Sequence, residues 1–273
     1  MATRRRLDAE LVRRGLAPSR EAAGEAVAAG TVLVGGAVAS KPSRLVAPGD
    51  AVSLLAPART FASRGGDKLD PVLDRFGVEV AGRRCLDAGA STGGFTDVLL
   101  RRGAAQVAAV DVGYGQLHLR LRDDERVLVL DRTNVRGLTA EAIGGPVDLV
   151  VADLSFISLT AVLDALAGAS TERAELVLLV KPQFEVGRQA AERGHGVIRD
   201  PALWAEAVGR VAGAAAALGL GVAGLCPSPR PGPAGNVEFF LHLRRDAGPI
   251  DPALLEEAVA DGQALAQRPG GRR

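Results

Sequence analysis

One pattern repeats between residues 84 and 245: a short run rich in Val, Leu and Ala is followed by a segment of helical composition. Runs that are apolar almost throughout indicate strands buried on both faces. Because they alternate with helical segments, they predict a parallel, doubly wound sheet with helices on each side. The fold class that we expect is therefore α/β of the Rossmann-like type. The predicted strands are RCLDAG, QVAAVDV, RVLVLDR, VDLVVADLSF, ELVLLVKPQF, GVAGLCPSP and VEFFLHLRR.

The composition fits an ordinary globular protein. The chain has 273 residues, of which 47% are hydrophobic and 24% charged, a length typical of one large domain with a smaller one. Its two cysteines, Cys85 and Cys226, lie far apart in apolar surroundings. They fit neither a metal cluster nor a disulfide framework and indicate a reducing, cytoplasmic environment. The longest apolar stretch, residues 211–225, is shorter than the about 18 residues of a membrane span, so we expect no membrane partner.

The N-terminal segment differs from the rest in pattern and charge. Its first apolar residues have helical spacing, and Ser19 can cap a second helix. Further on, the apolar period changes to two, and Gly35-Gly36 stands between two apolar runs, as in a tight hairpin. Residues 1–60 hold nine Lys or Arg against five Asp or Glu. This is a mild indication of nucleic-acid binding, which a solvated helix face would also explain.

The sequence RLDAELVRRGLAPSREAAGEAVAAGTVLVGGAVASKPSRLVAPGD closely resembles a small RNA-binding domain of the S-four type, first described in a protein of the small ribosomal subunit. The resemblance implies that two helices and the following turn present a basic face to structured RNA. Phosphate contacts of this kind give a salt-dependent affinity with little sequence information. The residues that the resemblance would place on this face are Arg4, Arg5, Arg6, Arg13, Arg14, Arg20, Lys41 and Arg44.

A glycine-rich segment, DAGASTGGFT, ends the first predicted strand of the larger region. Gly89, Gly93 and Gly94 would let a ligand approach the backbone closely at the start of a helix. Their spacing, G-x-x-x-G-G, differs from the G-x-G-x-x-G of dinucleotide-binding loops, and the acidic Asp87 stands before them. This pattern favours a ligand with an ammonium group over a pyrophosphate. The spacing alone is equally typical of a plain strand-to-helix turn.

Acidic residues also end the next two predicted strands. Asp111 follows Asp87 by 24 residues, close to the separation at which a carboxylate accepts hydrogen bonds from a ribose diol. Asp131 ends the third strand, where a carboxylate can receive an adenine amine. Any one of them alone would be typical of a helix cap or a turn. Together the three predict an adenosine-containing ligand with a charged amino-acid end, which is S-adenosylmethionine.

Two lysines and two further carboxylates flank the same strands. Asp153 ends the fourth predicted strand and Lys181 the fifth, whereas Lys68 precedes the first and Glu238 begins the last. A lysine at the end of an apolar strand is costly to bury unless it is paired or deprotonated. In a doubly wound sheet, Asp153 and Lys181 would lie beside the ligand, and the other two can converge on it.

Several ordered motifs carry a wider resemblance: SRGGDKL, DAGASTGGFT, DVGYGQL, DLSFISL, VKPQFEVGR and NVEFF. They look like the haemolysin TlyA family of ribosomal RNA 2′-O-methyltransferases, whose catalytic domain has an FtsJ-like fold. The resemblance implies S-adenosylmethionine as the methyl donor and a cytidine in ribosomal RNA of the small or large subunit, or both, as the substrate. It also implies a catalytic tetrad and a donor pocket. The tetrad would be Lys68, Asp153, Lys181 and Glu238, and the pocket Asp87, Gly89, Ser91, Gly93, Gly94, Asp111 and Asp131. Within this tetrad we assign Lys181 as the general base for the ribose hydroxyl, with the carboxylates orienting the two amines.

These resemblances divide the chain into an RNA-binding domain at residues 1–58, a linker at 59–67 and a methyltransferase domain at 68–273. We expect a monomer without a metal, whose partner is ribosomal RNA or a ribosomal subunit. Two other interpretations stay open: a non-catalytic RNA-binding or ribosome-assembly factor that retains the fold, and a nicotinamide-dependent oxidoreductase, which the glycine spacing disfavours. The glycine-rich, basic segment 187–200 is either a loop that closes over RNA or cofactor, or a surface loop.

Overall fold

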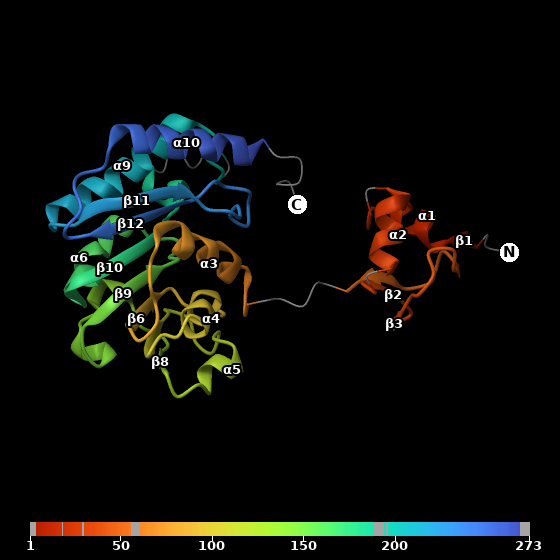
Figure 1. Cartoon of the computed structure of the whole chain (residues 1–273), viewed down its shortest axis with the longest axis horizontal. Helices are drawn as coiled ribbons and strands as arrows, with labels where there is room; N and C mark the ends of the chain where they lie inside the picture. Colours follow the sequence, from red (N-terminus) through yellow and green to blue (C-terminus); the bar gives the residue numbers. More distant parts are fainter. Residues whose placement is uncertain are drawn as a thin grey trace. The chain divides into compact units, whose positions relative to one another are not determined.

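A computed structural model gives the fold of the chain and describes residues 4–17, 19–28, 30–55, 61–187, 194 and 196–267. The chain forms two compact units, Met1–Arg59 and Thr60–Arg273 (Figure 1). Each unit has a hydrophobic core of its own. We call them the N-terminal unit and the C-terminal unit.

The N-terminal unit combines two helices with short strands. Ser19 Oγ accepts a hydrogen bond of 3.1 Å from the amide of Ala22, so this serine caps the second helix as its position predicts. Gly35 and Gly36 form the turn between two paired strands, and both have the positive φ of a two-residue hairpin turn. The elements are β1 (Arg5–Arg6), α1 (Leu7–Arg13), α2 (Arg20–Ala28), β2 (Val32–Val34), β3 (Ala37–Val38), β4 (Leu45–Val46) and β5 (Val52–Leu54).

A seven-stranded sheet forms the centre of the C-terminal unit, in the order β11-β12-β10-β9-β6-β7-β8. The strands are β6 (Arg84–Ala88), β7 (Gln106–Val110), β8 (Val127–Leu130), β9 (Val147–Ala152), β10 (Ser170–Val180), β11 (Gly221–Pro227) and β12 (Phe239–Arg244). Five of them, from β8 to β10 in that order, pair in parallel. The predicted α/β fold class is confirmed.

Helices cover both faces of this sheet (Figure 1). They are α3 (Arg64–Phe76), α4 (Gly94–Arg101), α5 (Leu119–Arg122), α6 (Leu163–Gly168), α7 (Pro182–Glu185), α9 (Pro201–Ala217) and α10 (Pro252–Ala266), with 3-10 turns η1 (Val135–Gly137), η2 (Glu141–Ile143) and η3 (Leu159–Ala161). Neighbouring residues of one strand enter different cores: Leu178 packs with residues of α6 and α9, and Leu179 with residues of α3 and α4. This alternation explains the continuous apolar runs. Within the described residues, no helix is both long and apolar enough to cross a membrane.

One strand departs from the all-parallel sheet that the sequence pattern predicts. β12 runs antiparallel to both of its neighbours, β10 and β11, with Phe239 opposite Val180. The prediction was wrong here because the connection from β11 to β12, residues 228–238, contains no helix. A parallel return needs a long crossover connection, usually a helix, whereas an antiparallel return does not. The reversed direction brings the start of β12 to the edge of the sheet at which the parallel strands end.

Part of the segment that the sequence pattern predicts as a linker, residues 59–67, is helical. α3 begins at Arg64, and Ser63 caps it by accepting a hydrogen bond of 3.2 Å from the amide of Gly65. The other segment that the sequence analysis singles out, 187–200, is described only in part, because 188–193 and 195 lie outside the described residues.

Candidate active site

The candidate site lies at the edge of the sheet where the parallel strands end. Lys181 directly follows β10, Asp153 follows β9, and the loop 89–93 joins β6 to α4. These three strands are neighbours, so their ends bring the three segments together. The antiparallel β12 begins at the same edge, and Glu238 precedes its first residue. The first turns of α3 contribute Lys68.

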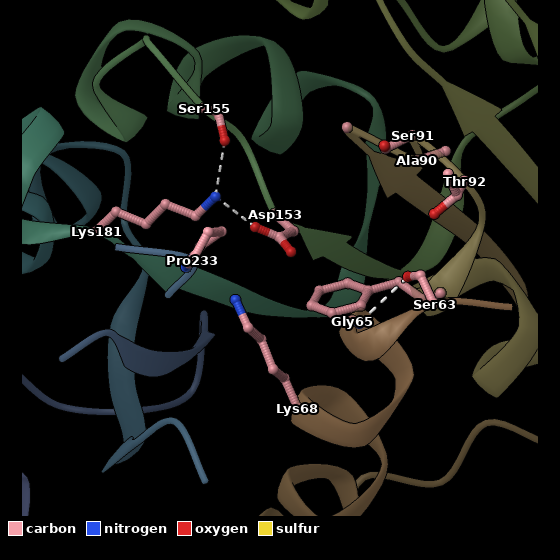
Figure 2. Close-up of a pocket in the computed structure, with 13 residues that line it drawn as sticks. Ser63, Gly65, Lys68, Ala90, Ser91, Thr92, Asp153, Ser155, Lys181 and Pro233 are labelled. Atoms are coloured by element: carbon pink, nitrogen blue, oxygen red, sulfur yellow. Dashed lines mark hydrogen bonds and ion pairs between the residues drawn. The ribbon is translucent and has the colours of Figure 1, made fainter. Parts of the chain in front are cut away.

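A pocket of about 210 Å³ opens between these segments (Figure 2). Three of the four predicted catalytic residues line it: Lys68, Asp153 and Lys181. Their side chains converge from α3, from the end of β9 and from the end of β10 (Figure 2). Among the predicted cofactor residues, Gly89, Ser91 and Gly94 line the same pocket. Five predicted residues are not among those that line the pocket: Asp87, Gly93, Asp111, Asp131 and Glu238.

The four tetrad side chains form two ion pairs. Lys68 Nζ lies 2.7 Å from Glu238 Oε2, and Lys181 Nζ lies 2.6 Å from Asp153 Oδ1. The two lysines are only 6% and 7% exposed and Glu238 is 1% exposed, so each charge has a partner where solvent cannot supply one. Glu238 Oε1 has no hydrogen-bond partner among the described residues. The structure thus brings together the side chains that the sequence places at four separate strand and helix ends.

The glycine loop between β6 and α4 requires glycine for two reasons. Gly89 has φ +88°, and a Cβ there would lie 2.9 Å from the backbone oxygen of Asp153. Gly93 has φ +94°, and a Cβ there would overlap the side chains of Leu117 and Leu121. Both positions favour glycine by conformation and by lack of space. The loop therefore holds its backbone against the loop that carries Asp153.

Asp87 lies beneath this loop and is fully buried. Thr96 Oγ1 donates a hydrogen bond of 2.6 Å to Asp87 Oδ2. Burial raises the pKa of this carboxyl to about 7, and the hydrogen bonds from Thr96 oppose the shift only in part. Asp87 Oδ1 has no partner among the described residues. The structure therefore contains a buried carboxyl group beside the pocket whose second oxygen is unpaired.

Asp111 and Asp131 directly follow β7 and β8, as predicted, and both bond to neighbouring segments of the chain. Asp111 accepts hydrogen bonds from the amides of Ser91, at 2.8 Å, and of Gly113, at 2.7 Å. Asp131 lies 2.6 Å from the guanidinium of Arg122. The hydrogen bond from Arg122 lowers the pKa of Asp131. Both side chains are partly exposed, at the strand ends next to the glycine loop.

Sequence reasoning missed two residues of this region. Ser155 lines the pocket and accepts a hydrogen bond of 2.9 Å from Lys181 Nζ. Glu185, at the end of α7, is 3% exposed and accepts hydrogen bonds from the Leu159 amide, at 2.7 Å, and from Ser158 Oγ, at 2.5 Å. Burial raises the pKa of Glu185. Both residues stand in the motifs DLSFISL and VKPQFEVGR, but their spacing alone distinguishes neither from a turn residue.

Two nearly buried carboxylates of α1 organise the basic residues of the N-terminal unit. Asp8 lies 2.9 Å from the guanidinium of Arg6 and 3.1 Å from that of Arg20. Glu10 forms ion pairs with Arg13, at 2.6 Å, and with Arg14, at 2.8 Å. These hydrogen bonds hold the pKa of both carboxyls well below the usual range. The other predicted contacts, Arg4, Arg5, Lys41 and Arg44, are exposed and have no side-chain partner among the described residues.

Comparison with known proteins finds a matching family model for each of the two units. Residues 61–245 match the FtsJ-like methyltransferase model, and residues 5–52 match the S4 domain model. The first match spans most of the chain and the fold agrees with it, so the chain belongs to the FtsJ-like methyltransferases. The interpretation as a nicotinamide-dependent oxidoreductase is therefore wrong.

Full-length relatives narrow the family further. The chain is 55% identical over 272 residues, 98% of this chain and 100% of the other, to a 16S/23S rRNA (cytidine-2′-O)-methyltransferase TlyA of Mycobacterium tuberculosis. A solved structure from Streptococcus thermophilus, named for a hemolysin, is 37% identical with a TM-score of 0.74 and covers 97% of this chain and 98% of its own. Another from Lactococcus lactis, also named for a hemolysin, is 41% identical with a TM-score of 0.70 and covers 74% and 98%. The chain is a member of the TlyA family.

Proposed function

We propose that this chain transfers a methyl group from S-adenosylmethionine to the ribose 2′-hydroxyl of a cytidine in ribosomal RNA. The observation that carries the proposal is the convergence of the buried pair Lys68–Glu238 and the partly buried pair Lys181–Asp153 at one pocket beside a glycine loop. The name of the Mycobacterium tuberculosis relative supports the substrate, since it specifies cytidine-2′-O methylation of 16S and 23S rRNA. The match of the N-terminal unit to the S4 domain supports RNA as the partner.

The residues around the pocket fit S-adenosylmethionine. This cofactor supplies, when bound, an electrophilic methyl group on a sulfonium. Asp87 Oδ1, buried and unpaired, suits an ammonium group that it meets directly or through water. The pocket of about 210 Å³ is smaller than the roughly 300–1,000 Å³ of typical ligand pockets. We therefore place the methionine end along Gly89, Ser91, Gly93 and Gly94, and the adenosine end along the more open loops of Asp111 and Asp131.

Lys181 acts as the general base in this proposal. A ribose hydroxyl is a weak nucleophile until a base removes its proton, and a neutral amine at Nζ can accept that proton. The ribose oxygen then bonds to the methyl carbon while the bond from that carbon to sulfur breaks. Asp153, 2.6 Å away, stabilises the ammonium that Lys181 becomes. Holding the hydroxyl and the methyl group together supplies a large part of the rate.

Lys68 has a different task because its partner, Glu238, holds it at 2.7 Å on the other wall of the pocket. Its positive charge faces the region where the ribose oxygen carries developing negative charge. A fixed charge in a poorly solvated site stabilises such a transition state without reorganisation. Glu238 keeps this ammonium in place and is a positioning residue.

The N-terminal unit binds RNA through phosphate contacts in this proposal. Asp8 and Glu10 hold four arginines in fixed positions, which reduces the entropy lost when these side chains meet RNA. The unpaired Lys41 and Arg44 are free to add further phosphate contacts. Specificity for one nucleotide then depends on RNA shape and on the C-terminal unit.

Transfer of radiolabel from S-adenosylmethionine tests this function. The purified protein is incubated separately with small subunits, large subunits and naked ribosomal RNA from a strain that lacks the modification. We expect label in RNA with the wild type and less than about 1% of it with Lys181→Ala. Label on none of the substrates, with RNA binding intact, would instead support a non-catalytic assembly factor.

A further inference from the structure

We propose that Ser155 is a positioning residue for the general base: together with Asp153 it directs the lone pair of the neutral Lys181 amine at the substrate hydroxyl. The inference rests on the proposed function, since it needs Lys181 to accept a proton. It adds a residue outside the lysine–aspartate–lysine–glutamate tetrad, and it explains a hydrogen bond that the tetrad alone leaves without a role.

The two N–H groups of the neutral Lys181 amine determine where its lone pair points. A neutral primary amine has two N–H groups and one lone pair. Lys181 Nζ donates a hydrogen bond of 2.9 Å to Ser155 Oγ and forms an ion pair with Asp153 Oδ1 at 2.6 Å. Asp153 Oδ1 has no hydrogen-bond partner among the described residues, so it is open to accept a second N–H group. When one N–H group of the neutral amine binds Ser155 and the other turns to Asp153, only the lone pair remains unassigned. No hydrogen-bond partner of Nζ other than Ser155 occurs in the described part of the chain, and Asp153, Ser155 and Lys181 line the same pocket (Figure 2).

A single acceptor would not suffice. With Asp153 alone, the amine can rotate about the Cε–Nζ bond and present its lone pair in several directions. The second acceptor stops this rotation, because both N–H groups are then held. Orientation of a reacting group before the reaction contributes a large share of enzymatic rate acceleration.

The loop that carries Ser155 is fixed at its beginning by the sheet and a strained turn. The Asp153 amide donates a hydrogen bond of 3.1 Å to the oxygen of Ala88 in β6. Directly after Ser155, Phe156 has φ +63°, a left-handed conformation that is costly for a bulky residue. Phe156 is also 92% exposed, so burial of its ring does not offset this cost. Strain of this kind persists where the surroundings fix a local geometry.

Glu185 fixes the same loop at its other end. Its carboxylate binds Ser158 and the Leu159 amide, at 2.5 and 2.7 Å. Glu185 is the last residue of α7, a helix that begins one residue after Lys181. The buried carboxylate therefore joins the segment of the base to the segment of Ser155. Both partners of the 2.9 Å hydrogen bond are attached to one rigid arrangement.

A purely structural role for Ser155 does not fit its surroundings. Its side chain is exposed to the pocket, and its described hydrogen bond is the one with Lys181. Ser158 differs, because it caps η3 and binds Glu185 and Thr160. Removing the hydroxyl of Ser155 should therefore leave the fold intact and act on the reaction.

The test compares Ser155→Ala and Ser155→Thr with the wild type in methyl transfer to the ribosomal substrate that the wild type modifies. For Ser155→Ala we expect kcat to fall about 10- to 100-fold, with KM for S-adenosylmethionine and for RNA unchanged within about twofold. Ser155→Thr keeps Oγ and should recover kcat to within about threefold of wild type. The control is Ser170→Ala at the start of β10, away from the pocket. It removes a hydrogen bond of 2.6 Å to the backbone oxygen of Leu166 and should not change kcat.

Each outcome decides the inference. A Ser155→Ala enzyme with kcat within twofold of wild type, or with a raised KM at unchanged kcat, would overturn it. Failure of Ser155→Thr to recover activity that Ser155→Ala has lost would also overturn it, because the effect would then not depend on the hydroxyl. If the wild type itself methylates no RNA, the proposed function fails and not this assignment alone.

Discussion

At the scale of single residues, the site concentrates charge where solvent is nearly absent. Lys68 and Glu238 form a buried ion pair, and such pairs contribute little to stability because desolvation offsets their attraction. Removing only one partner leaves an isolated charge and costs about 3–5 kcal/mol. We therefore propose that this pair serves the reaction and not the stability of the fold.

Single and double substitutions of this ion pair should have different effects on stability. Glu238→Leu should lower the free energy of unfolding by about 3–5 kcal/mol, because Lys68 stays buried without a partner. The double variant Lys68→Met/Glu238→Leu should recover most of this stability, since no charge remains, but no activity. Urea unfolding and methyl transfer measure the two effects. Recovery of both together would show that the pair is structural.

A second prediction at this scale concerns Asp87, whose pKa burial raises to about 7. In the unfolded chain an aspartate has a pKa near 4. Because the folded-state pKa is the higher one, protonated Asp87 stabilises the fold fully below about pH 4, and this contribution is lost as the pH rises through about 7. Asp87→Asn lacks this dependence.

We therefore expect the stability of Asp87→Asn relative to wild type to increase by about 1–3 kcal/mol between pH 5 and pH 8. Urea unfolding of the ligand-free proteins at both pH values measures it. The comparison with wild type cancels the titration of all other groups. A difference that stays constant with pH would contradict the buried, unpaired state of this carboxyl.

At the scale of elements, the glycine loop after β6 sets the distance between two strand ends. Gly89→Ala should lower stability by about 1–2 kcal/mol through its positive φ and weaken S-adenosylmethionine binding further, because the Cβ would press on the loop of Asp153. Gly82→Ala is the matched control: it has φ +75° but open space around the Cβ. Calorimetric titration should show weaker binding for Gly89→Ala alone. Equal binding by both variants would contradict the close approach.

The elements also show how far the sequence can be interpreted. Strands buried on both faces have a clear apolar signature, and the residues at their ends could be located from it, including Asp153 and Lys181. The direction of β12 could not, because an apolar run is the same in either direction. Ser155 and Glu185 could not be predicted from the sequence. Their hydrogen bonds join residues that are 26 and 27 positions apart along the chain, which no local spacing encodes.

At the scale of the whole molecule, two units of different charge share one chain. The exposed Lys41 and Arg44 have no side-chain partner among the described residues, and each is free to neutralise a phosphate. Lys41→Ala/Arg44→Ala should raise the Kd for RNA about tenfold and reduce the slope of log affinity against log salt by about 1–2. At saturating RNA, kcat should not change.

Filter binding over a range of salt concentrations measures this prediction. Arg210→Ala, which removes an exposed charge paired with Glu206 on α9, is the control and should leave the salt slope unchanged. An unchanged slope in the Lys41→Ala/Arg44→Ala variant would remove these two residues from the RNA-binding face.

The cytoplasmic location, the monomeric state and the domain boundaries stay predictions from the sequence.

The chemical identity of the product shows whether Lys181 activates a ribose hydroxyl of cytidine. Ribosomal RNA from an unmodified strain is incubated with S-adenosylmethionine and wild type or Lys181→Ala, digested to nucleosides and analysed by mass spectrometry. We expect 2′-O-methylcytidine with the wild type and none above background with the variant. A methyl group on a base, or equal amounts of product with both proteins, would contradict it.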